Sequence, residues 1–215
     1  MARVKPTSPV RDQYLRRWID RGGSGGFGGS GGHSEGVFPL PHARIGLWLL
    51  LGMITLLFCS ILSAYIVRLG LGDWHALPEP MVLWFNTVCL VLSSVAFQWA
   101  ATEARRGQPE RMRRGLWAAG AFALLFIAGQ LWAWQQLQAL GYFVASNPSN
   151  SFFYLITALH GLHLIGGLVA WGLTSLRVQQ GAGVAQVRLN VELCALYWHF
   201  LLVIWLALFG LMLFT

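Results

Sequence analysis

The stretch SFFYLITALHGLHLIGGLVAW, residues 151–171, decides how this chain folds. It is apolar over a length that can cross a membrane, since about 20 helical residues span a hydrocarbon core of roughly 30 Å. His160 and His163 lie in its middle, and residues three apart share one face of a helix. Because polar groups are costly in lipid, this face is expected to pack against protein. A candidate partner is the Tyr-Trp-His segment 197–199 in the last apolar run.

The composition of the chain indicates that its main solvent is lipid. Hydrophobic residues make up 56% of the 215 residues and charged residues only 11%, and there are 11 tryptophans. The net charge of +7 does not indicate nucleic-acid binding, because the basic residues form clusters between long apolar runs. This arrangement is typical of residues that orient a membrane protein.

Five apolar runs are each long enough to span a membrane, and they lie at about 45–67, 81–102, 116–140, 152–176 and 191–214. The sequence therefore predicts an all-α integral membrane bundle of five transmembrane helices over residues 45–215. The connections are short, so consecutive helices are expected to be antiparallel neighbours. The small residues Gly115, Ala119 and Ala123, and likewise Gly166 and Ala170, recur every four positions and indicate close helix approach.

Residues 1–44 form a polar, basic N-terminal tail. Residues 10–19 have the spacing of a short interfacial helix, and a disordered tail is the alternative; both stay open. The segment GGSGGFGGSGG, residues 22–32, is predicted to be a flexible tether.

The distribution of Lys and Arg predicts the orientation of the bundle. All of them except Arg68 fall in the tail and in the connections 103–115 and 177–190, which lie on the same side of a five-span chain. Because basic residues are retained on the cytoplasmic side, the N-terminus is expected inside and the C-terminus outside.

The histidines inside the spans have three possible roles. His163 and His199 are expected near the midplane, at similar depth, so that helices four and five could be joined by a polar clasp that also includes His160. Hydrogen bonding between helices is the interpretation we favour, and haem or metal ligation and proton handling are the alternatives. We expect no catalytic, cofactor-binding or metal-binding residue on this chain.

The other polar groups in the spans are also interpreted as groups that join helices. Glu192 lies on the same helix face as His199, near the inner boundary of the fifth span, so it is included in the predicted clasp. Arg177 and Arg188 are its expected ion-pair partners. Asn86, Thr87 and Gln130 are expected to form interhelical hydrogen bonds.

Five segments of the chain resemble, in order, the subunit III family of haem–copper cytochrome c oxidases. NSFFYLITALHGLHLIGG (150–167) resembles the family signature, and VELCALYWHFLLVIWLALF (191–209) resembles its final helix. Upstream, LWLLLGMITLLF (47–58), LWFNTVCLVLSSVAFQWA (83–100) and FIAGQLWAW (126–134) are similar to the preceding helices. The resemblance implies a five-helix form that lacks the two N-terminal helices of longer members.

The resemblance also implies a non-catalytic role in a bacterial inner membrane. In this family the haems and coppers belong to partner subunits, and subunit III contacts mainly subunit I, then subunit II, and binds structural phospholipid. Membership of a larger respiratory supercomplex stays open.

The sequence departs from the family pattern at three acidic positions, where it has Ile54, Ala133 and Leu202. A role of those acids in proton supply is therefore not carried over to this chain. His160, His163, Glu192 and His199 match the family pattern, which favours retained packing.

The leading hypothesis is an accessory subunit of a terminal oxidase that reduces O2 on its partner subunits. Variants of it are the equivalent subunit of a quinol oxidase or an accessory subunit of nitric oxide reductase. Two hypotheses from other classes are an autonomous b-type cytochrome, in which His160 or His163 and His199 bind haem, and an ion or proton transporter. The transporter is disfavoured because the sequence has no inverted repeat and almost no deep carboxylate.

Overall fold

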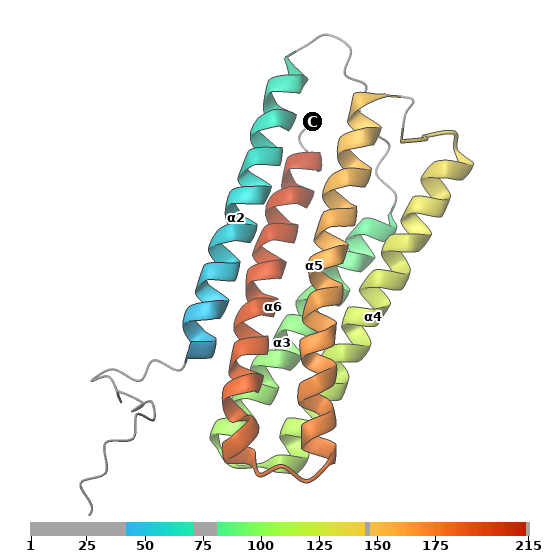
Figure 1. The fold of residues 1–215 in the computed structure, drawn as a ribbon. Helices are drawn as coiled ribbons and strands as arrows, with labels where there is room; N and C mark the ends of the chain where they lie inside the picture. The colour runs from blue at the N-terminus through green and yellow to red at the C-terminus, as the bar shows by residue number, and fades with distance from the viewer. Residues whose placement is uncertain (1–41, 71–80, 145–146, 214–215) are drawn as a thin grey trace, which may run out of the picture. The chain divides into compact units, whose positions relative to one another are not determined.

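The structure, a computed structural model, describes residues 42–70, 81–144 and 147–213. They form five helices, which are α2 (His42–Leu69), α3 (Val82–Arg105), α4 (Pro109–Ala139), α5 (Pro148–Gln179) and α6 (Val184–Leu213) (Figure 1). Each is long and apolar enough to cross a membrane, which confirms the predicted fold class. Residues 1–41, which include the predicted tether and interfacial helix, lie outside the described residues.

Four of the helices close into a ring of antiparallel neighbours. α3 packs against α4 and α6, and α5 packs against the same two helices from the other side (Figure 1). The expectation that consecutive helices are neighbours therefore holds from α3 onward, but it is wrong for the first pair. α2 packs against α5 and α6, where it buries Leu51, Ile54, Phe58 and Tyr65 along one stripe.

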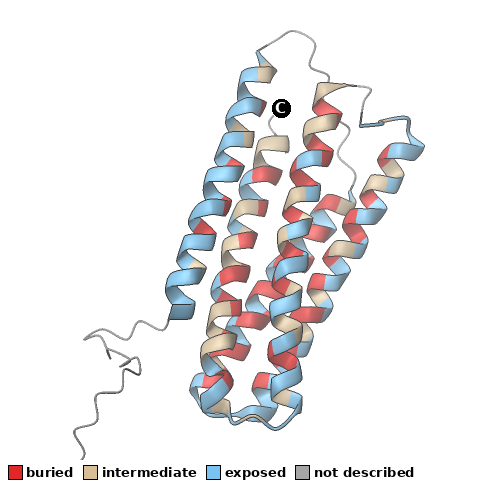
Figure 2. Ribbon diagram, in the orientation of Figure 1, coloured by how far each residue is buried: buried red, intermediate tan, exposed pale blue. Residues whose placement is uncertain are grey.

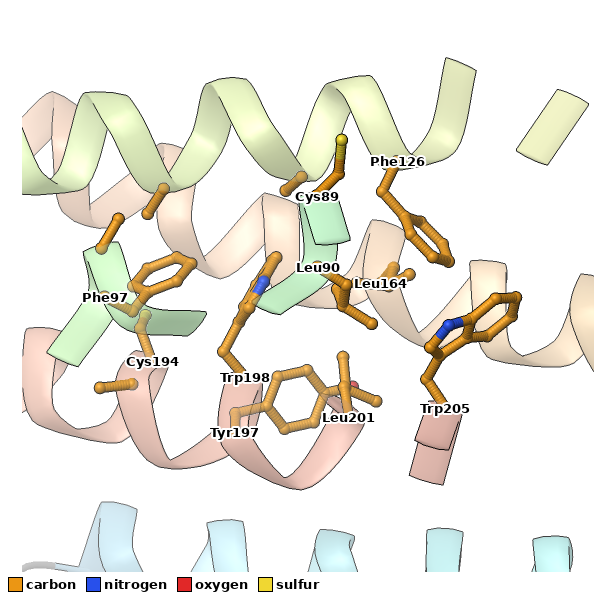
Figure 3. Close-up of a cluster of buried hydrophobic side chains, with 14 of the residues drawn as sticks. Cys89, Leu90, Phe97, Phe126, Leu164, Cys194, Tyr197, Trp198, Leu201 and Trp205 are labelled. Atoms are coloured by element: carbon orange, nitrogen blue, oxygen red, sulfur yellow. The ribbon is translucent and has the colours of Figure 1, made fainter. Parts of the chain in front are cut away.

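The core of the bundle is built around aromatic side chains of α6. The Trp198 side chain is fully enclosed, and its ring lies 4.5 Å from that of Phe97 on α3 (Figure 3). Trp205, about two turns further along the same face of α6, meets Phe126 of α4 edge to face with 4.9 Å between the ring centroids (Figure 3). α2 contributes little to this core, since most of its residues are exposed (Figure 2), as expected for a helix solvated by lipid.

Three helices end in the same way, with a glycine in the left-handed conformation. Gly107, Gly141 and Gly181 have φ values of 70°, 89° and 82°. In each case the glycine N–H and the next N–H bond back to carbonyls of the last helical turn, as Gly141 to Gln138 and Tyr142 to Leu137. This Schellman motif supplies hydrogen-bond donors to the last carbonyls of the helix, which hydrocarbon could not do. It also ends the helix where the chain turns.

The small-residue pattern is confirmed on α4 but not on α5. Gly115 lies directly against Ala100 of α3, and the fully buried Ala119 presents its carbonyl to α3, where it accepts a hydrogen bond of 2.8 Å from Ser93. Gly166, in contrast, has no atom within 4 Å of where its Cβ would stand. The close approach on α5 is instead made by Gly167, one residue further, which packs against Trp198.

Candidate functional site

His160 of α5 lies at the point where side chains of four helices meet. It is completely buried, and its ring contacts those of Phe58 on α2, Phe126 on α4 and Trp205 on α6, at 6.5, 5.9 and 5.2 Å between centroids. Neither ring nitrogen has a hydrogen-bond partner among the described residues. Aromatic rings of three other helices thus surround this imidazole.

His163 contacts α6 through its backbone and not through its ring. Its Nδ1 lies 2.7 Å from the carbonyl of Leu159, in the preceding turn of the same helix. The hydroxyl of Tyr197 donates a hydrogen bond of 3.0 Å to the carbonyl of His163, which joins α6 to α5. A polar link between α5 and α6 is thus made by the side chain of Tyr197 and the backbone of His163.

The ring of His163 lines an apolar groove between α2, α5 and α6, here called the α2–α5–α6 groove. Its volume is about 360 Å³, and it is lined by Leu47, Leu50, Leu162, His163, Gly166, Gly167, Ala170, Leu193, Cys194, Tyr197 and Trp198. Phe58 packs against the imidazole at 5.6 Å.

His199 lines a different groove, between α3 and α6, here called the α3–α6 groove. Its Nδ1 lies 2.5 Å from the carbonyl of Ala195, so it too bonds to its own helix. The groove has a volume of about 570 Å³ and also includes Leu202, one of the positions where the sequence departs from the family. The structure therefore does not bring His163 and His199 into one site, and their role as a clasp stays a prediction.

Glu192 brings three helices together at the arginine-rich end of the bundle. Its Oε1 accepts hydrogen bonds from Arg105 of α3 at 3.0 Å and from Arg188 of its own helix at 3.1 Å. Its Oε2 accepts one from Arg44 of α2 at 3.3 Å. Of the two expected partners, Arg188 is present, whereas Arg44 and Arg105 stand where Arg177 was expected. The side chain is only 13% exposed, which is consistent with its three cationic neighbours.

Asn86, Thr87 and Gln130 form hydrogen bonds between helices. The amide of Asn86 on α3 donates to Gln130 on α4 at 3.2 Å, and the indole of Trp205 donates to Thr87 at 2.9 Å. Ile54 and Ala133, which stand where longer family members have acids, are buried in apolar packing.

Sequence reasoning missed the carboxylate of Glu103, which is buried to 2% exposure at the end of α3. One of its oxygens accepts a hydrogen bond of 2.9 Å from Arg106, and the other lies 4.0 Å from Arg111. The spacing of three residues between Glu103 and Arg106 was visible in the sequence, but it does not reveal burial.

The fold and these sites define a class, a multi-pass helical membrane protein whose buried polar groups join helices. A family model described as Cytochrome c oxidase subunit III matches residues 42–215. The chain is 30% identical to Cytochrome c oxidase subunit 3 of Thermostichus vulcanus, over 80% of this chain and 87% of that one. It is 25% identical to Cytochrome bo(3) ubiquinol oxidase subunit 3 of Pseudomonas putida, over 77% and 82%.

The chain therefore belongs to the cytochrome c oxidase subunit III family. It is a haem–copper oxidase subunit III, and so one member of an oxidase complex with other subunits.

Proposed function

We propose that this chain is a non-catalytic subunit that stabilises the catalytic subunit I of its oxidase, contacts subunit II, and carries neither haem nor copper. The observation that supports this most directly is the separation of the imidazoles. Two histidines that bind one haem must face each other across it, whereas His163 and His199 line different grooves and His160 is enclosed by rings. This geometry disfavours an autonomous b-type cytochrome.

The test is purification of the full chain with its complex under mild detergent. Recovery with a subunit that shows a haem spectrum supports the proposal, and the chain should have no Soret band once it is separated. A Soret band in the separated chain that disappears in His199→Ala, but persists in His163→Ala, would instead establish haem binding through His199.

The same preparation distinguishes between two possible electron donors of the complex. The relatives include proteins named for cytochrome c and one named for ubiquinol. We favour cytochrome c as the donor of the complex, so oxygen uptake should follow addition of reduced cytochrome c. Uptake that depends on a quinol instead would assign the chain to a quinol oxidase.

We further propose that the α2–α5–α6 groove holds a structural phospholipid chain. Its lining is apolar apart from the imidazole of His163 and the hydroxyl of Tyr197, which suits an acyl chain. Gly166→Phe should fill the groove and reduce the phospholipid retained in native mass spectrometry. Gly172→Phe is the matched control, because that glycine also has open space but does not line the groove. Equal retention in the two variants would contradict this site.

The arginine clusters support an orientation with the N-terminus in the cytoplasm of a bacterium and the bundle in its inner membrane. Arg44, Arg105 and Arg188 meet at Glu192, so three of the basic segments lie at one end of the bundle. A reporter enzyme that is active only outside the cytoplasm should be active when fused to the C-terminus and inactive when fused to the N-terminus. The reverse pattern would invert the orientation.

A further inference from the structure

The two halves of α2 differ in how they pack on the bundle. From Leu51 onward the helix buries four side chains, and the ring of Phe58 lies 5.6 Å from that of His163 on α5. Residues 42–50 include no buried side chain; Leu47 is half-buried and the others are exposed (Figure 2). Because hydrophobic stabilisation scales with buried apolar area, separation of residues 42–50 from the bundle would cost little.

Residues 42–50 also cover the α2–α5–α6 groove. Leu47 and Leu50 line the groove from the side of α2, and Gly166 and Ala170 line it from the side of α5. The volume of about 360 Å³ therefore lies between the weakly packed half of α2 and the rest of the bundle. Outward movement of this half would open the groove sideways to the bilayer.

Arg44 ties the weakly packed half of α2 to α6 at the arginine-rich end of the bundle. Its guanidinium lies 3.3 Å from Oε2 of Glu192. Among the described residues, this is the only side-chain hydrogen bond or ion pair that joins residues 42–50 to another helix. When Arg44 leaves, Glu192 keeps Arg105 at 3.0 Å and Arg188 at 3.1 Å. Release therefore does not leave an uncompensated carboxylate, which would be costly.

The turn between the two halves has two features that allow a helix to bend. Gly52 has no atom within 4 Å of where its Cβ would stand, so close packing does not require a glycine there. A glycine restricts the backbone less than any other residue does. The hydroxyl of Thr55 donates a hydrogen bond of 2.8 Å to the carbonyl of Leu51, a contact that often bends helices. The turn from Leu51 to Thr55 thus has the properties of a hinge.

We propose that residues 42–50 form a lateral gate, which swings about the turn from Leu51 to Thr55 and opens the α2–α5–α6 groove to the bilayer. The pair of Arg44 with Glu192 is its latch. The second half of α2 stays in place, because two ring contacts hold it to α5. This inference rests on the proposed phospholipid in the groove and assigns the route by which that phospholipid enters and leaves.

Pulsed electron paramagnetic resonance on the full chain in phospholipid nanodiscs tests the gate. Spin labels in place of Trp48 and Ala121 join the gate to α4, and labels in place of Val67 and Leu131 join the second half of α2 to the same helix; all four side chains are exposed. The exposed Cys59 is replaced by serine. The first pair should give a broad or two-peaked distance distribution, and the second pair a narrow one. Equally narrow distributions would overturn the proposal.

Two glycines of α2 supply matched variants for the hinge. Gly46 and Gly52 both have open space for a methyl group, but only Gly52 lies in the hinge turn. Gly52→Ala should narrow the distance distribution of the gate and lower its open fraction about threefold, because alanine stiffens a helix relative to glycine. Gly46→Ala lies inside the gate and should leave the distribution unchanged. An equal effect of the two variants would contradict a hinge at Gly52.

Substitution of the arginine tests the latch. Arg44→Gln should raise both the open fraction and the rate at which isotopically labelled phospholipid replaces the bound one, each about twofold to fivefold. Native mass spectrometry follows the replacement. Arg113→Gln is the matched control, because the side chains of Arg113 and Arg44 are 50% and 47% exposed, and Arg113 pairs with Glu110 of its own helix. The same exchange rate in both variants would contradict the latch.

These outcomes also separate the gate from the phospholipid site on which it rests. Equal phospholipid retention in Gly166→Phe and Gly172→Phe would refute the site, and with it the route. A chain that retains phospholipid in the groove, but shows a single narrow distance between the gate and α4, would refute only the gate.

Discussion

At the scale of single residues, glycines set how closely the helices approach. A Cβ on Gly120 would overlap the indole of Trp171, and one on Gly129 would overlap the amide oxygen of Asn86. At Gly167 the same atom would lie 2.6 Å from Cζ3 of Trp198. Large side chains thus pack directly onto backbone, which brings two helices together without a small residue on both.

Gly120→Ala should therefore destabilise the bundle, because the indole of Trp171 would have to leave its place and its hydrogen bond to the carbonyl of Leu116. The expected loss is about 1–3 kcal/mol, as for other overpacked cores. Unfolding of the purified chain in detergent measures it. Gly166→Ala is the control, since no atom lies within 4 Å of the new methyl group. Equal stability of the two variants would contradict this account of the contact.

The contrast between Gly166 and Gly167 shows that the sequence does not predict which glycine of a helix contacts a neighbouring helix. A spacing of four residues predicts that small residues share a face, and this was sufficient for Gly115 and Ala119. It does not say which face meets a neighbour, because both glycines of α5 lie in an apolar run without a polar side. The large indole of Trp198, distant in sequence, selects Gly167.

At the scale of helices, aromatic donors form the polar links between neighbours. Trp205 joins α6 to α3, Trp171 joins α5 to α4, and Trp134 of α4 donates to Thr157 of α5. Tyr197 joins α6 to α5. The sequence predicted Thr87 as a partner in such a link, but for the link between α5 and α6 it indicated the imidazoles and not the phenol of Tyr197. An indole or phenol reaches further than an imidazole and buries more apolar surface on the way.

Trp205→Phe removes the N–H that Thr87 accepts while it keeps a ring against Phe126. We expect a loss of about 0.5–1 kcal/mol in the free energy of unfolding, in line with interhelical hydrogen bonds in membranes. Trp84→Phe serves as the comparison, since Trp84 is 51% exposed and packs edge to face on Phe209. If Trp84→Phe costs as much as Trp205→Phe, loss of ring size and not of the hydrogen bond explains the effect.

At the scale of the whole molecule, the sequence was sufficient for the fold class and for the approximate spans, but not for the position of α2. Length and hydropathy specify that a segment crosses the membrane, yet they carry no information on its lateral neighbour. α2 shows this clearly, since it has a narrow buried stripe and a broad lipid-facing surface. One polar tie of α2 to the bundle is the pair of Arg44 with Glu192, and the cationic partners of Glu192 come from three separate helices.

Because α2 has so little buried surface, Glu192→Gln should loosen it more than the rest of the bundle. Exposed ion pairs contribute about 0.2–1 kcal/mol each, so loss of three around a largely buried carboxylate should cost about 1–2 kcal/mol. Hydrogen exchange should rise in α2 and stay unchanged in α3 and α4. Salt should reduce the difference from the unaltered chain, since it screens the pairs.

Glu110→Gln removes a carboxylate that is 64% exposed and pairs with Arg113 of its own helix at 2.9 Å. This variant should leave the exchange of α2 unaltered, because its single ion pair joins no second helix and water screens it. If both variants change α2 equally, a general charge effect at this end of the bundle is responsible. If neither does, the ion pairs of Glu192 are not needed to hold α2, and its other contacts with α5 and α6, which include the stripe from Leu51 to Tyr65, determine its place.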